Sequence, residues 1–271
     1  MIIPIICIFT LNKFLQANFM KIIISPAKSL DFESKVSTNL HTEPIFLNQS
    51  KKLNNKLKTL SRKKLSTLMS ISDDLARLNY ERNQDWTLPF TTKNAKQAIY
   101  AFTGAVFQGI NVNTIEASKI PDLQHKLRIL SGLYGILKPL DLIQPYRLEM
   151  GTKLKIGTKE NLYKFWDDTV ADALNNELEE NELLINLASA EYFKVIPKKV
   201  LKVPMITPIF KDFKNGEYKT IMTYAKKARG LMVRYIIDNN INTLEELKNF
   251  NIEDYRFSEE MSKNNELVFT R

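Results

Sequence analysis

An Asn-Gly pair between two alternating segments is the feature that most narrows the folds open to this chain. In "MITPIFKDFKNGEYKTIMTY" (residues 205–224), Asn215 and Gly216 separate two runs in which apolar and polar residues alternate. Such a pair is typical of a type I′ turn, because both central residues need a positive φ that asparagine and glycine tolerate. The segment is therefore predicted to be an antiparallel hairpin, which argues against a purely parallel sheet.

Short apolar runs and helical patterns intermingle along the rest of the chain. Three runs have the length and composition of buried strands: "KIIIS" (21–25), "RILSG" (128–132) and "ELLINLAS" (182–189). Helices are predicted over 46–60, 62–70, 73–84, 121–127, 161–180 and 223–239. A further short helix is expected to begin at Thr243, with Glu246 as its capping-box partner.

Few residues that interrupt helices and strands divide this pattern. The chain has 8 glycines and 10 prolines in 271 residues, and no Ser- or Gly-rich linker or fixed-period repeat interrupts it. We therefore expect a mixed α/β (α+β) fold in which one domain, residues 20–271, has a mixed central sheet surrounded by helices.

The first nineteen residues stand apart from this domain. Their apolar run ends at Leu11, about half the length of a membrane-spanning helix, and no basic residue precedes it as in a secretory signal. Met20 then begins the region of the first predicted strand. Residues 1–19 are interpreted as an N-terminal extension from a misassigned start codon, and a weak signal or anchor segment is the alternative.

The charge and the cysteine content limit the functions that this chain could have. The net charge of +9 and the isoelectric point near 9.3 favour an anionic partner. Residues 49–72 carry seven cations and no acid, whereas residues 166–193 carry eight acids and no Lys or Arg. Cys7 is the only cysteine and His41 and His125 are the only histidines. This composition favours the cytoplasm and predicts no metal site, no cofactor and no thiol catalysis.

The segment "YAKKARGLMVRYII" (224–237) places four cations on one predicted helix: Lys226, Lys227, Arg229 and Arg234. At 100° per residue they fall within an arc of roughly 160°, opposite an apolar face. No carboxylate lies among them, so we expect them to line a cleft and bind an anion, with a solvated helix face as the alternative. Gly230 within this helix indicates close backbone packing or close approach of a ligand.

Two loops after predicted strands could hold an anion or polar ligand. "SPAKSLD" places Ser25, Lys28 and Ser29 at a strand end, where side chains and backbone N–H groups can bind an anion, unless Lys28 is simply solvated. "INLASAEYF" (185–193) places Asn186, Ser189 and Glu191 near the end of another strand, where polar side chains can build a site. There the favoured interpretation is that Ser189 caps the following helix.

The segment "LRILSGLYGILKPLDLIQPYRLEMG" (127–151) is rich in turn residues. Gly132 and Gly135 bracket a turn that loosely resembles the hairpin of a helix-hairpin-helix nucleic-acid module, with its glycines spaced three apart rather than two. Arg147 and Glu149 alternate on an extended stretch and are expected to point to one side. They form either a buried structural ion pair or an anion-binding Arg oriented by its carboxylate.

These segments together resemble one family. "IISPAKSLD", "SDDLARLNYERNQDW", "LSGLYGILKPLDLIQPYRLEMG", "LYKFWDD", "INLASAEYF" and "YAKKARGLMVRYII" occur in the order and spacing of the YaaA family of bacterial peroxide-stress proteins, from Met20 to Arg271. The resemblance implies a single mixed α/β domain with a positively charged cleft and a helix-hairpin-helix-like element. It also implies binding to duplex and single-stranded DNA, and protection against hydrogen peroxide linked to low free intracellular iron. By motif, the implied cleft cations are Lys28, Arg147, Lys226, Lys227 and Arg229.

Two hypotheses follow. The first is a non-enzymatic, monomeric DNA-binding protein of the peroxide response with little sequence preference, whose affinity falls with salt at a log–log slope of about −4 to −6. Its predicted DNA-binding residues are Lys28, Gly132, Gly135, Arg147, Lys226, Lys227, Arg229 and Arg234. The alternative is an enzyme that acts on a small anionic or nucleotide-like substrate in the same cleft, with Glu149 or Glu191 as general base.

Overall fold

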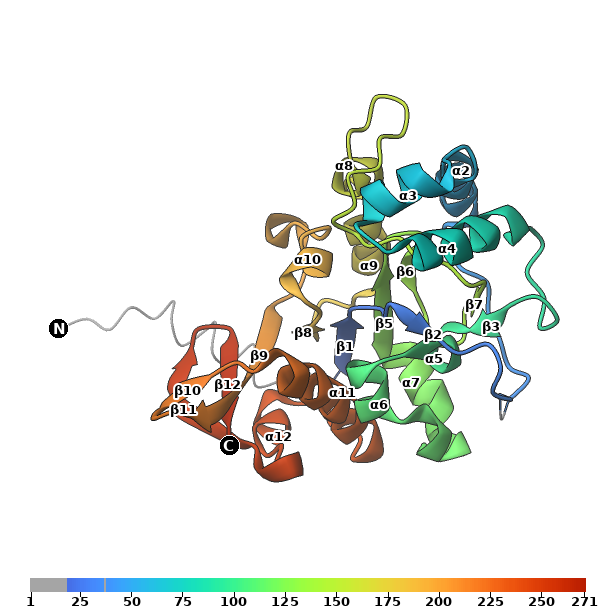
Figure 1. The fold of residues 1–271 in the computed structure, drawn as a ribbon. Helices are drawn as coiled ribbons and strands as arrows, with labels where there is room; N and C mark the ends of the chain where they lie inside the picture. Colours follow the sequence, from blue (N-terminus) through green and yellow to red (C-terminus); the bar gives the residue numbers. More distant parts are fainter. Residues whose placement is uncertain (1–18, 37) are drawn as a thin grey trace.

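The computed structural model describes residues 19–36 and 38–271, and its centre is an eight-stranded mixed sheet (Figure 1). The strands run in the order β11-β12-β9-β8-β1-β5-β6, and β10 pairs with β9. Their bounds are β1 Phe19–Ile24, β5 Leu127–Ser131, β6 Gly135–Leu137, β8 Glu182–Leu187, β9 Met205–Lys214, β10 Glu217–Lys219, β11 Arg256–Lys263 and β12 Glu266–Thr270. The predicted extension, residues 1–19, lies outside the described residues except for Phe19.

The order of the strands reverses beside β1. β1 pairs in parallel with β5 on one side and with β8 on the other, and β8 pairs in parallel with β9. The chain therefore first builds outward from β1 to β5 and later returns to the opposite side of β1 with β8. The carboxyl ends of β1 and β8 form a topological switch point, where open α/β sheets bind ligands.

Antiparallel strands at the edges make the sheet mixed, as predicted. β6 is antiparallel to β5, β11 to β12 and β10 to β9. The β9–β10 hairpin turns at Asn215 (φ 56°) and Gly216 (φ 83°), which confirms the predicted type I′ geometry. Two small two-stranded sheets pair β2 (Ser29–Leu30) with β4 (Phe102–Thr103) and β3 (Lys96–Gln97) with β7 (Leu142–Ile143).

The predicted helices are present within a few residues, with one exception. The longer helices are α2 Leu47–Lys58, α3 Arg62–Met69, α4 Asp73–Asp85, α7 Ile120–Lys126, α9 Thr169–Glu177 and α11 Met222–Asp238. Two of the shorter helices, α8 Leu162–Trp166 and α12 Leu244–Lys248, lie where helices were predicted. No helix range was predicted for α5 Ala98–Ala101, α6 Ala105–Ile110 and α10 Ala190–Phe193. The capping box of Thr243 and Glu246 at the start of α12 is confirmed.

The helix predicted over 161–180 is instead two helices. Asp167 has φ 47° and ends α8, and α9 begins two residues later. The side chain of Trp166 explains the break, because it is fully buried and its indole N–H donates to the carbonyl of Gly132 at 3.1 Å. Holding this ring under the β5–β6 turn redirects the chain before α9 can start.

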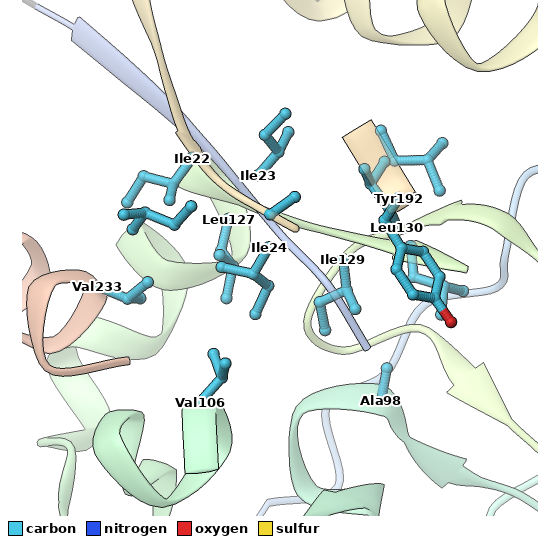
Figure 2. Packing of buried hydrophobic residues seen from close by; sticks show 14 of the residues in the cluster. Ile22, Ile23, Ile24, Ala98, Val106, Leu127, Ile129, Leu130, Tyr192 and Val233 are labelled. Atoms are coloured by element: carbon cyan, nitrogen blue, oxygen red, sulfur yellow. The ribbon is translucent and has the colours of Figure 1, made fainter. Parts of the chain in front are cut away.

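The apolar core lies on both faces of the parallel strands (Figure 2). Ile22 and Ile24 of β1 point to the side on which Val106 of α6 and Val233 of α11 lie, whereas Ile23 points the other way. This alternation is the two-residue period of a strand, and all three isoleucines have no exposed surface. Each contributes roughly 1.5–3 kcal/mol by burial. Ile22 and Ile24 thereby hold α6 and α11 against the sheet.

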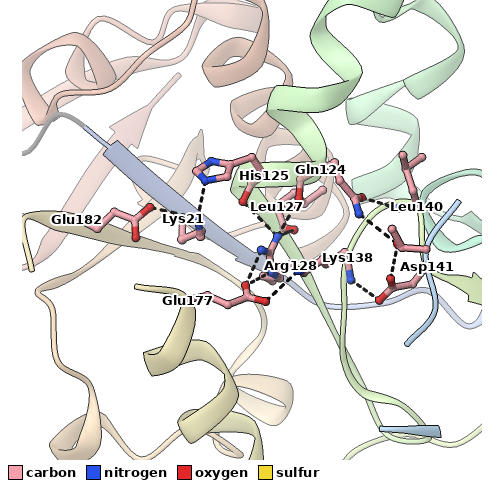
Figure 3. Close-up of polar contacts among 11 residues, drawn as sticks. Lys21, Gln124, His125, Leu127, Arg128, Lys138, Leu140, Asp141, Glu177 and Glu182 are labelled. Atoms are coloured by element: carbon pink, nitrogen blue, oxygen red, sulfur yellow. Dashed lines mark hydrogen bonds and ion pairs between the residues drawn. The ribbon is translucent and has the colours of Figure 1, made fainter. Parts of the chain in front are cut away.

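A charged network connects the amino ends of the central strands to the neighbouring helices (Figure 3). Lys21 of β1 contacts Glu182 of β8 at 3.3 Å and the Nε2 atom of His125 at 3.4 Å. Arg128 of β5 contacts Glu177 of α9 at 2.5 Å. Breaking a buried pair of this kind typically costs about 3–5 kcal/mol. We interpret this network as structural, because its charges are already paired.

Candidate anion-binding cleft

A cavity of about 550 Å³ opens at the carboxyl ends of β1 and β8, and we call it the cleft. Its position matches the switch point of the sheet. The polar side chains in its wall are Ser25, Lys28, Ser29, Thr103, Glu149, Ser189, Glu191, Tyr192, Lys226 and Arg229.

Two serines join the strand ends at the base of the cleft. The backbone N–H of Ser189 donates to Ser25 Oγ at 2.8 Å, and the two hydroxyl oxygens lie 3.2 Å apart. Ser189 makes no side-chain cap to α10. The predicted capping role is therefore wrong, because the Ser189 hydroxyl faces Ser25 across the strand ends instead of the first turn of the helix.

One wall of the cleft depends on a close crossing of α6 and α11. A Cβ atom on Gly230 would lie 1.9 Å from the carbonyl oxygen of Val106, and one on Gly109 would lie 2.4 Å from that of Lys227. Only glycine at both positions allows the two backbones to approach this closely. The close backbone packing inferred for Gly230 is confirmed, and this packing sets Lys226 and Arg229 at the cavity.

Arg229 and Lys226 are the cations of the cleft that have no counter-charge. Among the residues that the structure describes, neither guanidinium nor ammonium group makes a hydrogen bond or an ion pair. Lys226 is exposed, whereas Arg229 is half-buried, and its burial lowers the pKa of the guanidinium. A desolvated charge without a partner is unfavourable until an anion binds beside it.

Glu149 links two further cations at the opposite wall. Its Oε2 atom lies 3.0 Å from Lys28 Nζ, and its Oε1 atom lies 3.1 Å from Arg147 Nη2. Lys28 is 63% exposed and can move toward a ligand, whereas Arg147 is only 15% exposed and does not line the cleft. The geometry therefore favours the structural ion pair over an anion-binding Arg147, and Arg147 can act on the cleft only through Glu149.

Glu191 and Tyr192 complete the polar wall. Glu191 accepts a hydrogen bond from the backbone N–H of Gly151 at 3.0 Å, which holds its carboxylate at the cavity. Burial raises the pKa of Tyr192, and electrostatic repulsion from the phenol group of Tyr146 and the carboxylate of Glu191 raises it further. The Tyr192 hydroxyl therefore stays protonated and can donate a hydrogen bond. Tyr192 and Thr103 were missed from the sequence, because only the fold brings them here.

The predicted turn at Gly132 and Gly135 does not reach a ligand. The segment forms the β5–β6 hairpin, whose tip residues Leu133 and Tyr134 have no exposed surface. A Cβ atom on Gly132 would lie 2.2 Å from the carbonyl oxygen of Leu148, and Gly135 packs against the ring of Trp166. The helix-hairpin-helix-like interpretation is wrong here, since these glycines serve internal packing rather than phosphate approach.

Two of the four helix cations are neutralised within the protein. Lys227 pairs with Glu253, which also contacts Arg271 at 3.2 Å. Arg234 contacts Asp238 at 2.5 Å and the hydroxyl of Thr114 at 2.6 Å. The expectation of four uncompensated cations is therefore wrong for Lys227 and Arg234.

Only one of these two ion pairs could be read from the sequence. Asp238 lies four residues after Arg234 on the same helix, just beyond residues 224–237, and this spacing favours an ion pair. Glu253 comes from a separate loop, so its pairing with Lys227 required the fold.

The cleft thus combines three cations, two carboxylates and several hydroxyls in one cavity. Lys226 and Arg229 can bind an anionic group, with Lys28 able to join them. Among residues 19–36 and 38–271, no group of three or more His, Cys, Asp or Glu side chains could hold a metal ion. No helix in the same ranges has the length and apolar character needed to cross a membrane.

Comparisons with known proteins identify close relatives along most of the chain. A family described as peroxide stress protein YaaA matches residues 20–261. UPF0246 proteins of Flavobacterium johnsoniae and Flavobacterium psychrophilum are 57% and 59% identical over 252 residues, which is 93% of this chain and 100% of each relative. A UPF0246 protein of Hahella chejuensis is 50% identical over 254 residues, which is 93% of this chain and 99% of that relative.

Proposed function

Because the chain belongs to the YaaA family of peroxide stress proteins, we propose that it contributes to peroxide resistance by binding DNA phosphates in the cleft beside β1 and β8. The proposed partners are duplex and single-stranded DNA, bound with little sequence preference in the cytoplasm. The observation that carries this proposal is Arg229, a half-buried guanidinium at the cleft with no partner among the residues that the structure describes. A phosphate diester is an anion that a guanidinium binds through two parallel hydrogen bonds.

The proposed contact is smaller than the sequence suggested. Lys227 and Arg234 are used in internal ion pairs, so the cations available at the cleft are Lys28, Lys226 and Arg229. Three phosphate contacts correspond to a log–log salt slope of about −3 on duplex DNA and about −2 on single strands. Backbone contacts of this kind position DNA without reading its bases.

A salt series with matched variants tests this proposal. Fluorescence anisotropy would measure binding of a 20-base-pair duplex and a 20-nucleotide strand by the wild type, Arg229→Gln and Lys226→Gln. A charge-assisted hydrogen bond contributes about 1.5–3 kcal/mol, so Arg229→Gln should weaken binding roughly 10- to 100-fold and lower the salt slope by about one.

Lys263→Gln is the matched control, because Lys263 is an exposed cation at the end of β11 that does not line the cleft. Its affinity should equal that of the wild type. A wild-type slope near zero, or Arg229→Gln binding DNA as tightly as the wild type, would contradict the proposal.

A second candidate function is an enzyme for a small anionic or nucleotide-like substrate. It is favoured by Glu149 and Glu191, since two carboxylates repel phosphates and a passive DNA groove does not need them. Either carboxylate could act as a general base beside a substrate held by Arg229.

Glu149→Gln separates the two functions. If the cleft binds DNA, this change removes a negative charge and frees Lys28 from its pair, so DNA affinity should rise. If cells that carry the variant lose peroxide protection while the purified protein keeps or gains DNA affinity, catalysis is favoured instead.

We include a lower level of free intracellular iron in the proposed stress role. The chain would bring this about without storing iron itself. Equilibrium dialysis of the purified protein against ferrous iron should show no tight binding. Stoichiometric retention of iron would overturn this part of the proposal and point to direct sequestration.

A further inference from the structure

A second basic cavity lies away from the cleft, between α2, α3 and residues 153–155, and we call it the lysine groove. Its volume is about 570 Å³, and it shares no lining residue with the cleft. Figure 1 shows α2 and α3 at the top of the view with the loop that leads to α8, whereas α6 and α11 lie at the bottom. Five lysines line the groove: Lys56, Lys63, Lys64, Lys153 and Lys155.

In the described part of the chain, no carboxylate neutralises any of these five ammonium groups. All five side chains are exposed, and within the described residues none makes an ion pair or a side-chain hydrogen bond. No Asp or Glu of residues 19–36 or 38–271 lines the groove. Five like charges around one cavity repel one another, and no carboxylate in these ranges offsets this repulsion.

The start of α3 adds to this unfavourable arrangement. Arg62, Lys63 and Lys64 occupy its first turn, where no acidic residue is present. The helix macrodipole is positive there and favours anions. The local sequence is therefore the reverse of the one that would stabilise this helix, which is expected where the charges serve an external partner.

The floor of the groove is apolar. Leu154 is buried, and Leu60 and Leu68 are half-buried with surface that faces the cavity. Lys153 and Lys155 flank Leu154 on an extended stretch, so the leucine points inward while the lysines remain at the rim. The groove therefore offers an apolar surface enclosed by cations.

We propose that the lysine groove is a docking site for an acidic amphipathic helix of a partner protein. The apolar side chains of such a helix, spaced three and four residues apart, would cover Leu60, Leu68 and Leu154, and its flanking carboxylates would pair with the lysines. This proposal is independent of DNA binding in the cleft.

The apolar floor favours this occupant over nucleic acid. A phosphate backbone would pair with the lysines at the rim but leave the exposed parts of Leu60 and Leu68 in contact with water. Burying apolar side chains against the floor stabilises the complex more than exposed ion pairs do, because water and salt screen the ion pairs. Charge brings the helix to the groove, and the leucine floor gives it specificity.

Two peptides of equal charge test the proposal. One is a fluorescein-labelled 18-residue helix with leucine at i, i+3, i+4 and i+7 positions and glutamate beside them, and the other replaces each leucine with serine. The wild type should bind the leucine peptide at least 10-fold tighter than the serine peptide in an anisotropy titration.

Variants of the groove locate the binding. The double variant Lys63→Glu/Lys155→Glu should bind the leucine peptide at least 10-fold more weakly than the wild type. Leu68→Ser should reduce the preference for leucine over serine. The control Lys93→Glu/Lys263→Glu, which makes the same charge change outside the groove, should keep the wild-type preference. Urea unfolding of each variant checks that the fold is retained.

Three results would overturn the inference. Equal affinity for the two peptides would reduce the groove to a charged surface, and unchanged binding by Lys63→Glu/Lys155→Glu would place the peptide elsewhere. A 20-base-pair duplex that displaces the leucine peptide from the wild type would assign the groove to nucleic acid instead.

Discussion

Adding one methyl group at Gly230 should separate the two helices that build the cleft wall. A Cβ atom at this position would lie 1.9 Å from the carbonyl oxygen of Val106, and the next nearest atoms are also backbone atoms. Ordinary contacts to a Cβ atom begin near 3.4 Å, so α6 and α11 would have to move apart by more than about 1 Å. Overpacking of this kind costs about 1–3 kcal/mol, and the upper end applies because a backbone cannot rotate away.

The intrinsic preference of alanine for helices opposes part of this cost. Alanine is favoured over glycine within a helix by about 1 kcal/mol, so Gly230→Ala should destabilise the protein by about 2 kcal/mol. Gly109→Ala should have a similar effect, because its Cβ atom would lie 2.4 Å from the carbonyl oxygen of Lys227. The double variant should lose less than the sum, since one separation of the helices accommodates both methyl groups.

Urea unfolding followed by circular dichroism measures these differences. Asn55→Ala, on an exposed position of α2, is the control and should be neutral or slightly stabilising. If Gly230→Ala proves as stable as the wild type, or more stable, α6 and α11 do not cross as closely as described. The geometry of the cleft wall would then need a different explanation.

Two further predictions concern stability. Burial raises the pKa of Asp141 to about 6 from an ordinary value of 3.8, so its ionisation in the folded state is unfavourable and stability should fall as pH rises through that window. The difference between these two pKa values corresponds to roughly 3 kcal/mol of stability, and Asp141→Asn should lose this pH dependence. Urea-unfolding profiles that are identical for the two proteins between pH 4 and 7 would contradict this prediction. The hydroxyl of Thr243 caps α12 by accepting a hydrogen bond from the N–H of Glu246 at 3.2 Å. Thr243→Ala removes this cap and should lower the free energy of unfolding by about 1 kcal/mol. An unchanged thermal midpoint would show that α12 does not depend on this cap.

Local patterns in the sequence predicted the elements well where the determining residues are neighbours. Asn215 and Gly216 impose a turn through their own backbone preferences, and Thr243 and Glu246 cap a helix through contacts three residues apart. The helix boundary at Asp167 was missed because its cause is distant, namely the buried contact between Trp166 and the carbonyl of Gly132.

The cleft was predictable only in part for the same reason. Lys28, Lys226 and Arg229 do come together at one cavity, as expected from two separate segments. Nothing local to Lys227 could reveal that Glu253 would neutralise it. The spacing of Gly132 and Gly135 suggested a phosphate-binding turn, but glycines that allow two protein segments to pack have the same local pattern as glycines that admit a ligand.

The most direct test of the central claim is a crystal structure of the protein with a DNA duplex that contains a single-stranded gap. The account predicts a phosphate in the cleft, with its oxygens about 3 Å from the guanidinium of Arg229 and the ammonium of Lys226. DNA bound across another surface, with Arg229 in contact with no phosphate, would contradict the account.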